Sequence, residues 1–273
     1  MIGTTITYYL TSHPMVSTFR WSSAQLWGSS WSFLFSSVAL YISLSIAIHS
    51  IFSRCFRSAV ARGIPMGPIQ ALHNLTICVI SLVIFSGALL SSVAEIRDNR
   101  WLFGRRSMRT TPAQWLFCFP PGMRPSGRVF FWSYAFYLSR FVHILRTPIT
   151  ILAKGELPKF QLVSNSFLAL ISFLWLEFSQ SFQVVAILLS TMVNFVTYGY
   201  RFWTSIGMPG VRFPFVLGFQ VVLLVGNLVC HVMMLAMHFS IKAGCNGIGA
   251  LMFNSLLNCA ILLMFGNSMK KKK

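Results

Sequence analysis

Seven long apolar runs alternate with short polar segments along this chain. They cover residues 30–51, 75–93, 129–152, 162–178, 182–203, 213–239 and 247–269. Most are close to the roughly 20 residues that an α-helix needs to cross a bilayer. The pattern therefore predicts an all-α integral membrane protein with seven transmembrane helices in one bundle. It divides the chain into an N-terminal segment, 1–29, a membrane domain, 30–269, and a lysine tail, 270–273.

Seven spans place the two ends of the chain on opposite sides of the membrane. The lysine run at 270–273 favours a cytosolic C-terminus and a lumenal N-terminus, because positive charge gathers in cytoplasmic segments. The loops 52–68 and 201–212 then lie in the cytosol with five arginines. The loop 95–128 opposes this orientation, because it places seven arginines on the lumenal side.

The composition narrows the possible chemistry. The sequence is 55% hydrophobic and 10% charged, whereas soluble domains carry about a quarter charged residues. Its only acidic residues are Glu95, Asp98, Glu156 and Glu177, which argues against a catalytic carboxylate pair. The net charge of +18 fits orientation in the membrane and attraction to anionic headgroups. No nucleic-acid-binding module is visible.

The run 129–152 is unusual because it carries Arg140, His143, Arg146 and Thr147 at membrane depth. On a continuous helix, Arg140, His143 and Thr147 share one face, since they are spaced i, i+3 and i+7. Charged groups inside a membrane are costly and usually face a bundle interior or a polar cavity. The alternative is snorkelling to the interface, which suits Arg146 better than the mid-span Arg140.

The predicted orientation brings polar groups on four spans to a similar depth, open towards the cytosol. No acidic residue is expected at the depth of Arg140, so the arginines favour an anionic ligand or contact with water. A cytosolic amphiphile with an anionic head and an apolar tail would suit both the arginines and the surrounding helices. The polar groups from the other three spans are Asn165, Ser166, Asn194, Tyr198, Tyr200, Arg201 and Gln220.

The six cysteines show no CxxC spacing, and most fall in or beside apolar runs. Free cysteine there behaves as a small hydrophobic residue. Cys118 and Cys245 are the only plausible lumenal pair, and their spacing does not by itself favour a disulfide between them.

Four stretches of the chain resemble one protein family. They are Arg128–Tyr134, Phe173–Ser181, Tyr198–Trp203 and Gly244–Gly249. Over nearly its whole length the chain resembles the ELO family of very-long-chain fatty-acid elongases, most specifically the plant elongase-like branch. These are seven-span endoplasmic-reticulum acyltransferases. The lysines at the third and fourth positions from the end also resemble a dilysine retrieval signal, so the resemblance implies an endoplasmic-reticulum membrane protein.

The resemblance implies condensation of a long-chain acyl-CoA with malonyl-CoA to 3-oxoacyl-CoA, as in very-long-chain fatty-acid and sphingolipid synthesis. It implies no metal and no cofactor, because both CoA esters are substrates. The expected partners are membrane lipid and either other enzymes of the elongation cycle or a second copy of the chain. The alternative is a non-catalytic elongase-like protein that binds acyl-CoA or modulates an elongation complex.

The family's motifs are altered in this chain. Its Lys-x-x-Glu-x-x-Asp-Thr motif corresponds to Arg140, His143, Arg146 and Thr147. Its His-x-x-His-His box falls on Leu162, Asn165 and Ser166, and a further family histidine falls on Asn194. Tyr198, Tyr200 and Gln220 match the family pattern.

We therefore expect a catalytic set and a substrate-binding set. The expected catalytic residues are His143, Asn165 and Ser166, with His143 as the base, because imidazole exchanges protons near neutral pH. His49 and His73 are interpreted as interfacial residues, and His231 and His238 as packing or interfacial residues. The expected substrate-binding residues are Arg140, Arg146, Thr147, Asn194, Tyr198, Tyr200, Arg201 and Gln220.

Overall fold

The computed structural model describes residues 2–55, 66–98, 112–208 and 214–270, and these ranges are almost entirely helical. They contain no β-strand, only an isolated bridge between Arg20 and Ser126. The helices are α1 (Ile2–Thr7), the π-helical turn η1 (Tyr8–Ser12), α2 (Pro14–Ser17), α3 (Trp31–Cys55), α5 (Gly67–Arg97), α6 (Pro112–Phe117), α7 (Arg128–Ile144), α8 (Arg146–Lys154), α9 (Lys159–Glu177), α10 (Gln183–Ser205), α11 (Pro214–Ser240) and α12 (Ile248–Lys270).

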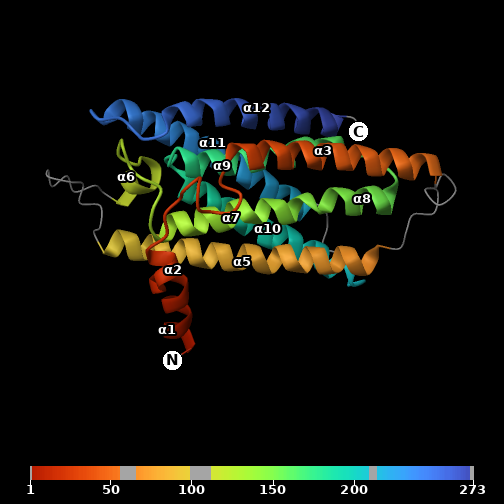
Figure 1. Ribbon diagram of the computed structural model, residues 1–273, viewed down its shortest axis with the longest axis horizontal. Helices are drawn as coiled ribbons and strands as arrows, with labels where there is room; N and C mark the ends of the chain where they lie inside the picture. Colours follow the sequence, from red (N-terminus) through yellow and green to blue (C-terminus); the bar gives the residue numbers. More distant parts are fainter. Residues whose placement is uncertain (1, 56–65, 99–111, 209–213, 271–273) are drawn as a thin grey trace.

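The long helices run roughly along one direction and form an elongated bundle (Figure 1). Each apolar run of the sequence is helical. The third run forms α7 and α8, and each of the other six runs forms one helix, which are α3, α5, α9, α10, α11 and α12. Within the described residues, α3, α5, α9 and α10 are long and apolar enough to cross a membrane. Shorter apolar stretches lie in α11 (Val225–Ser240) and α12 (Ile248–Met264). The chain is thus a multi-pass membrane protein.

The third run is two helices rather than the single helix expected. It breaks at Leu145, between α7 and α8. Pro148 explains the break, because it has no N–H to donate to the carbonyl of Ile144, four residues earlier, and its ring crowds that carbonyl. Leu145 N instead donates to Val142 O over three residues. Thr147 consequently lies in α8, which begins at Arg146, and not in the helix that carries Arg140 and His143.

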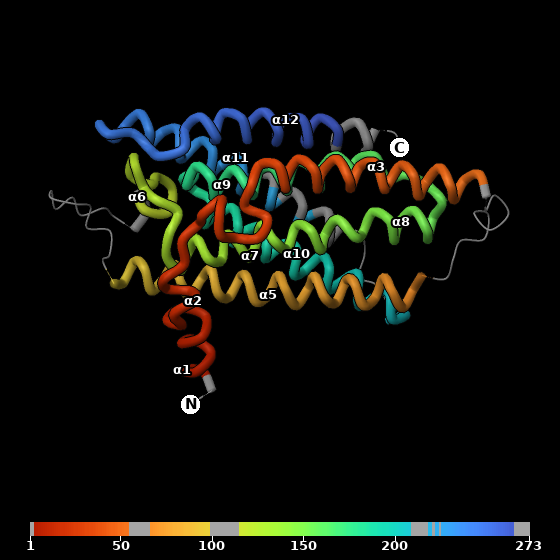
Figure 2. The backbone as a smooth tube through the Cα atoms, viewed as in Figure 1, coloured from red at the N-terminus to blue at the C-terminus, as the bar shows by residue number. Residues whose placement is uncertain are grey.

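One end of the bundle is closed by a disulfide between Cys118 and Cys245. We call this the disulfide end; it contains Cys118–Phe119, Ser179–Phe182 and Cys245–Gly247. The bond joins segments separated by 127 positions, a pairing that spacing alone did not favour. Neighbouring hydrogen bonds reinforce it, because Asn246 N donates to Phe119 O at 2.7 Å and Phe119 N donates to Ser181 Oγ at 2.9 Å. The turn 155–158 lies at the opposite end (Figure 2).

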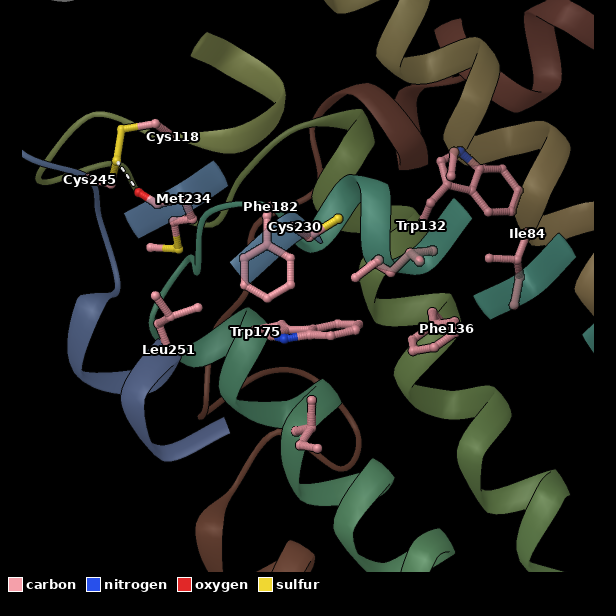
Figure 3. Close-up of a cluster of buried hydrophobic side chains, with 14 residues drawn as sticks. Ile84, Cys118, Trp132, Phe136, Trp175, Phe182, Cys230, Met234, Cys245 and Leu251 are labelled. Atoms are coloured by element: carbon pink, nitrogen blue, oxygen red, sulfur yellow. Dashed lines mark hydrogen bonds between the residues drawn. A yellow bond between two sulfur atoms is a disulfide. The ribbon is translucent and has the colours of Figure 1, made fainter. Parts of the chain in front are cut away.

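The N-terminal helices project from the side of the bundle, where α1 points away from α5 (Figure 2). Hydrogen bonds attach them, since Trp132 Nε1 donates to Leu10 O at 3.0 Å and Ser91 Oγ donates to the same carbonyl at 3.2 Å. The side chain of Leu10 also packs against the main apolar core. Trp132 belongs to the main apolar core together with Phe136, Trp175 and Phe182 (Figure 3). The core therefore anchors the N-terminal segment to the bundle.

We expect Gly87→Ala to lower the free energy of unfolding by about 1–3 kcal/mol. A Cβ at position 87 would overlap the indole of Trp132. The indole would have to shift, which disturbs its hydrogen bond to Leu10 O, and this outweighs the better helix propensity of alanine. Thermal denaturation in detergent measures the effect, with Gly249→Ala in α12 as the matched control because nothing lies within 4 Å there. Equal melting temperatures for the two variants would contradict this packing.

Candidate functional site

A cluster of polar side chains forms where α7 and α10 meet inside the bundle. Arg140 and His143 of α7 are only 5% and 6% exposed. Nη2 of Arg140 lies 3.3 Å from Nε2 of His143, and Nδ1 of His143 lies 3.1 Å from Oη of Tyr198 on α10. We call Arg140, His143, Arg146, Tyr198 and Arg201 the arginine cluster.

These contacts fix how His143 carries its proton. An arginine can only donate, so Nε2 of His143 must accept the hydrogen bond from Arg140. The proton of a neutral imidazole then lies on Nδ1 and is donated to the oxygen of Tyr198. The lone pair that His143 would use as a base is therefore directed at Arg140 in this arrangement. A ligand that draws Arg140 away would release it.

Tyr198 holds the remaining members of the cluster together. Nη1 of Arg146 donates to its hydroxyl at 3.3 Å. The guanidinium carbons of Arg146 and Arg201 lie 5.6 Å and 5.5 Å from the centre of its ring, within the range of a cation–π interaction. Arg140 in turn lies 4.1 Å from the ring centre of Phe136. Three cations are thus gathered around two aromatic rings.

No carboxylate in the described part of the chain forms an ion pair with these cations. In the described ranges the ion pairs are those of Arg128 with Glu95 at 4.0 Å and Asp98 at 3.2 Å, near the disulfide end of α5 and α7. Glu177 accepts a hydrogen bond from Trp21. Nε of Arg140 is buried and has no hydrogen-bond partner among the residues that the structure describes. A buried guanidinium without a protein anion suits an anionic ligand, and its planar fork suits phosphate or carboxylate.

His73 of α5 belongs beside this cluster, although the sequence suggested an interfacial position. It lies close enough to His143 and Arg146 for their charges to interact. Its Nε2 is buried and has no hydrogen-bond partner within the described part of the chain. A second imidazole thus accompanies His143. The sign of this position in the sequence was that His73 lies beside the predicted cytosolic end of the second apolar run, 75–93.

Thr147 and Asn165 lie in a different network. Thr147 Oγ1 is 2.6 Å from Tyr41 Oη, and Gln161 Nε2 donates to Thr147 at 3.2 Å. Asn165 Nδ2 donates to Tyr41 Oη at 3.4 Å. This network joins α3, α8 and α9. Thr147 lies in α8, after the break at Leu145, and its hydroxyl contacts Tyr41 of α3 and not the partners of His143.

The structure therefore does not join the three expected catalytic residues by hydrogen bonds. Asn165 bonds to Tyr41, and Ser166 Oγ donates to Leu162 O of its own helix at 3.0 Å. Tyr41 and Gln161 were missed in the sequence, because the first span was treated as apolar and Gln161 as part of a boundary.

Three expected binding residues remain. Asn194 is half-buried on α10, one turn before Tyr198, so it lies on the same side of that helix. Tyr200 is half-buried two residues after Tyr198. Gln220 lies in α11, and its side chain is outside the described residues, as are 271–273 of the lysine tail.

Comparison with known proteins agrees with the resemblance read from the motifs. The chain is 56% identical over 263 residues to "Fatty acid elongase 3-like" of Arabidopsis thaliana, covering 96% of this chain and 90% of that protein. It is 22% identical over 205 residues to "Fatty acid elongase sre1" of Dictyostelium discoideum, covering 74% and 69%. No solved structure matches the chain significantly. The model of the GNS1/SUR4 family matches residues 26–272, and the chain therefore belongs to this family, ELO.

Proposed function

We propose that this protein acts in fatty-acid elongation and condenses a long-chain acyl-CoA with malonyl-CoA. Membership of the ELO family and the similarity to fatty acid elongases support the general role. The observation that carries the specific reaction is the arginine cluster, a buried imidazole between cations that no described carboxylate neutralises. Such a site suits thioester substrates that carry phosphates and a carboxylate.

The reaction assigns a task to each part of the cluster. Malonyl-CoA loses its carboxylate as CO₂, and the electron pair left on carbon attacks the acyl thioester carbonyl. A new carbon–carbon bond forms, the carbon–sulfur bond breaks, and the departing CoA thiolate takes a proton. Arg140, Arg146 and Arg201 would hold the anionic groups. His143, hydrogen-bonded to Tyr198 at 3.1 Å, would relay the proton, since imidazole exchanges protons near neutral pH.

Binding and chemistry are coupled in this proposal. The lone pair on Nε2 of His143 accepts from Arg140 while no anion competes for that guanidinium. An anion that takes over the bond from Arg140 releases Nε2 for proton transfer. Arg140 would thus bind the anion and also keep His143 from proton transfer until the anion is bound.

The alternative is a non-catalytic protein that binds acyl-CoA or modulates an elongation complex. It is favoured by the positions that correspond to the family's histidine box, where Asn165 bonds to Tyr41 and Ser166 bonds to its own helix. Neither side chain can replace imidazole as a base. Purified protein in lipid vesicles, supplied with both CoA esters, distinguishes the two functions. Formation of 3-oxoacyl-CoA with release of CO₂ supports the enzyme; tight acyl-CoA binding with neither product supports the alternative.

The proposed topology has seven transmembrane segments, a lumenal N-terminus and a cytosolic C-terminus in the endoplasmic reticulum. The disulfide supports it, because disulfides persist in the lumen and are rare in the cytosol. It lies at the end opposite the turn 155–158, and α12 runs from the disulfide end towards the lysine tail. The arginine cluster then lies nearer the cytosol, where both CoA esters are available.

In sealed microsomes, we expect a C-terminal tag to be digested by added protease. We also expect Cys118 and Cys245 to resist maleimide labelling until a reductant is added, because they are bonded to each other. Gel mobility after reaction with a polyethylene-glycol maleimide measures the labelling of the cysteines, with Cys259 as the free-thiol control. A protected C-terminal tag would reverse the proposed orientation.

A further inference from the structure

Three fully buried amide side chains lie at the disulfide end, away from the arginine cluster. Gln180 is in the turn between α9 and α10, Gln183 begins α10, and Asn254 is on α12. All three residues are 0% exposed. Burying an amide is unfavourable unless its donors and acceptor are hydrogen-bonded, so their partners need to be accounted for.

The pairing of these amides is incomplete. Asn254 Nδ2 donates to Gln180 Oε1. Gln180 Nε2 and Asn254 Oδ1, the other two atoms of this pair, have no hydrogen-bond partner among the described residues. Nε2 and Oε1 of Gln183 also have no hydrogen-bond partner among the described residues. A buried donor or acceptor that stays unpaired destabilises the fold.

The indole of Trp175 also carries an unpaired polar atom, close to where α9 meets α12. Trp175 Nε1 is buried without a partner in the described ranges. Figure 3 shows the nitrogen of this indole on the side towards Leu251 of α12, and Asn254 follows Leu251 by three residues on the same helix face. Gln180 is tied to this tryptophan, because its backbone N donates to Trp175 O at 3.0 Å.

The backbone around Gln180 is held in an unfavourable conformation. Ser179 and Phe182 have φ values of 43° and 59°, in the left-handed region that residues with a Cβ seldom adopt. Gly247 packs so closely that a Cβ there would lie 2.9 Å from Gln180 Cα. Asn246 Nδ2 fixes the turn by donating to the carbonyls of Phe178 and Ser179. Strain maintained by surrounding bonds is typical of ligand-holding sites.

The unpaired atoms define the ligand. Gln180 Nε2 is a donor and Asn254 Oδ1 is an acceptor on one amide pair. A carboxylate or phosphate could only accept, and an ammonium could only donate. A hydroxyl oxygen does both, accepting from Gln180 and donating to Asn254. Apolar side chains such as Trp175, Phe182 and Leu251 surround this end of the bundle, which also disfavours a charged group.

We propose that Gln180 and Asn254 form a second, neutral binding site for a hydroxyl oxygen, supplied by an ordered water or by a hydroxyl on a bound lipid chain. The lipid source rests on the proposed function. From Gln183 at the disulfide end to Tyr198 of the arginine cluster, α10 rises about 22 Å, so the site lies far along the bundle from that cluster. A long acyl chain whose head is held by that cluster could present its far end here. The substrate class would then be an acyl-CoA with a terminal hydroxyl.

The first test is a high-resolution structure of the unmodified protein in lipid nanodiscs. We expect density for one oxygen within hydrogen-bonding distance of both Gln180 Nε2 and Asn254 Oδ1. A direct bond between these two atoms, closing a two-bond amide pair without such density, overturns the proposal. This test does not depend on any acyl-CoA binding, so it stands even if the proposed function fails.

The second test distinguishes the two sources of the oxygen by binding of acyl-CoA with and without a terminal hydroxyl. If the lipid supplies it, the natural protein binds the hydroxylated chain about tenfold more tightly, and Asn254→Leu abolishes the preference while keeping the affinity for the plain chain. Thr191→Val is the matched control, since Thr191 is buried but bonds within its own helix at 2.7 Å. Equal affinities in the natural protein, together with the density, assign the oxygen to water and overturn the lipid source.

Discussion

Replacing His143 with glutamine is expected to lower the rate of condensation by about 10²–10⁴-fold, the usual contribution of a positioned acid–base group. Glutamine keeps a polar side chain in the contact with Tyr198 but cannot exchange a proton near neutral pH. Binding of acyl-CoA should stay within about threefold of the natural value, because the anionic head is assigned to the arginines. Turnover in reconstituted vesicles and equilibrium binding measure the two effects separately.

His49→Gln is the matched control for this prediction, because it removes an imidazole from α3, outside the arginine cluster. It should leave turnover unchanged. The turnover of His73→Gln can be compared with that of His143→Gln, since His73 lies near His143 and Arg146. Full activity in His143→Gln would remove His143 from the chemistry. A loss of folding would be recognised by the failure of the variant to bind acyl-CoA.

The hydrophobic pattern was a reliable guide to the helices. Each apolar run became helix because a backbone in hydrocarbon must satisfy its own hydrogen bonds. The resemblance in the motifs was confirmed by the family match over residues 26–272. The break at Leu145 needed the structure, although Pro148 was the local signal, because proline can kink a helix without ending it.

The candidate site was only partly visible in the sequence. Predicted depth along each span grouped Arg140 and His143 with Tyr198, and hydrogen bonds join these three side chains in the structure. The prediction was possible because the rise of a helix gives each residue a calculable height. Depth says nothing about which helices are neighbours. Thr147 and Asn165 therefore appeared to belong with His143, whereas the packing of α3 against α8 and α9 gives them Tyr41 as a partner.

The disulfide shows another limit of reading a sequence. Cys118 and Cys245 are separated by 127 positions, and their proximity depends on how the segment after α6 meets the segment before α12. The same holds for Gln180 and Asn254, which are 74 positions apart. Long-range polar contacts of this kind arise from packing, and no local periodicity predicts them.

Replacing Arg140 with glutamine is expected to weaken acyl-CoA binding by about 1.5–3 kcal/mol, the usual contribution of a hydrogen bond to a charged group. This corresponds to about a tenfold to 150-fold rise in Kd. The physical reason is that Arg140 is 5% exposed and makes no ion pair with a described carboxylate, so an incoming anion would be its counter-ion. Isothermal titration or a fluorescent acyl-CoA displacement assay in detergent measures the change.

Two further variants show whether the effect comes from the charge at this position. Arg140→Lys keeps the charge but loses the planar fork, so its Kd should lie between those of the natural protein and Arg140→Gln. Arg128→Gln removes another buried arginine that pairs with Glu95 and Asp98, and it should leave the Kd unchanged. Unaltered affinity in a folded Arg140→Gln protein would exclude Arg140 from the anion site. Equal losses in Arg140→Gln and Arg128→Gln would instead indicate that acyl-CoA responds to the overall positive charge of the chain.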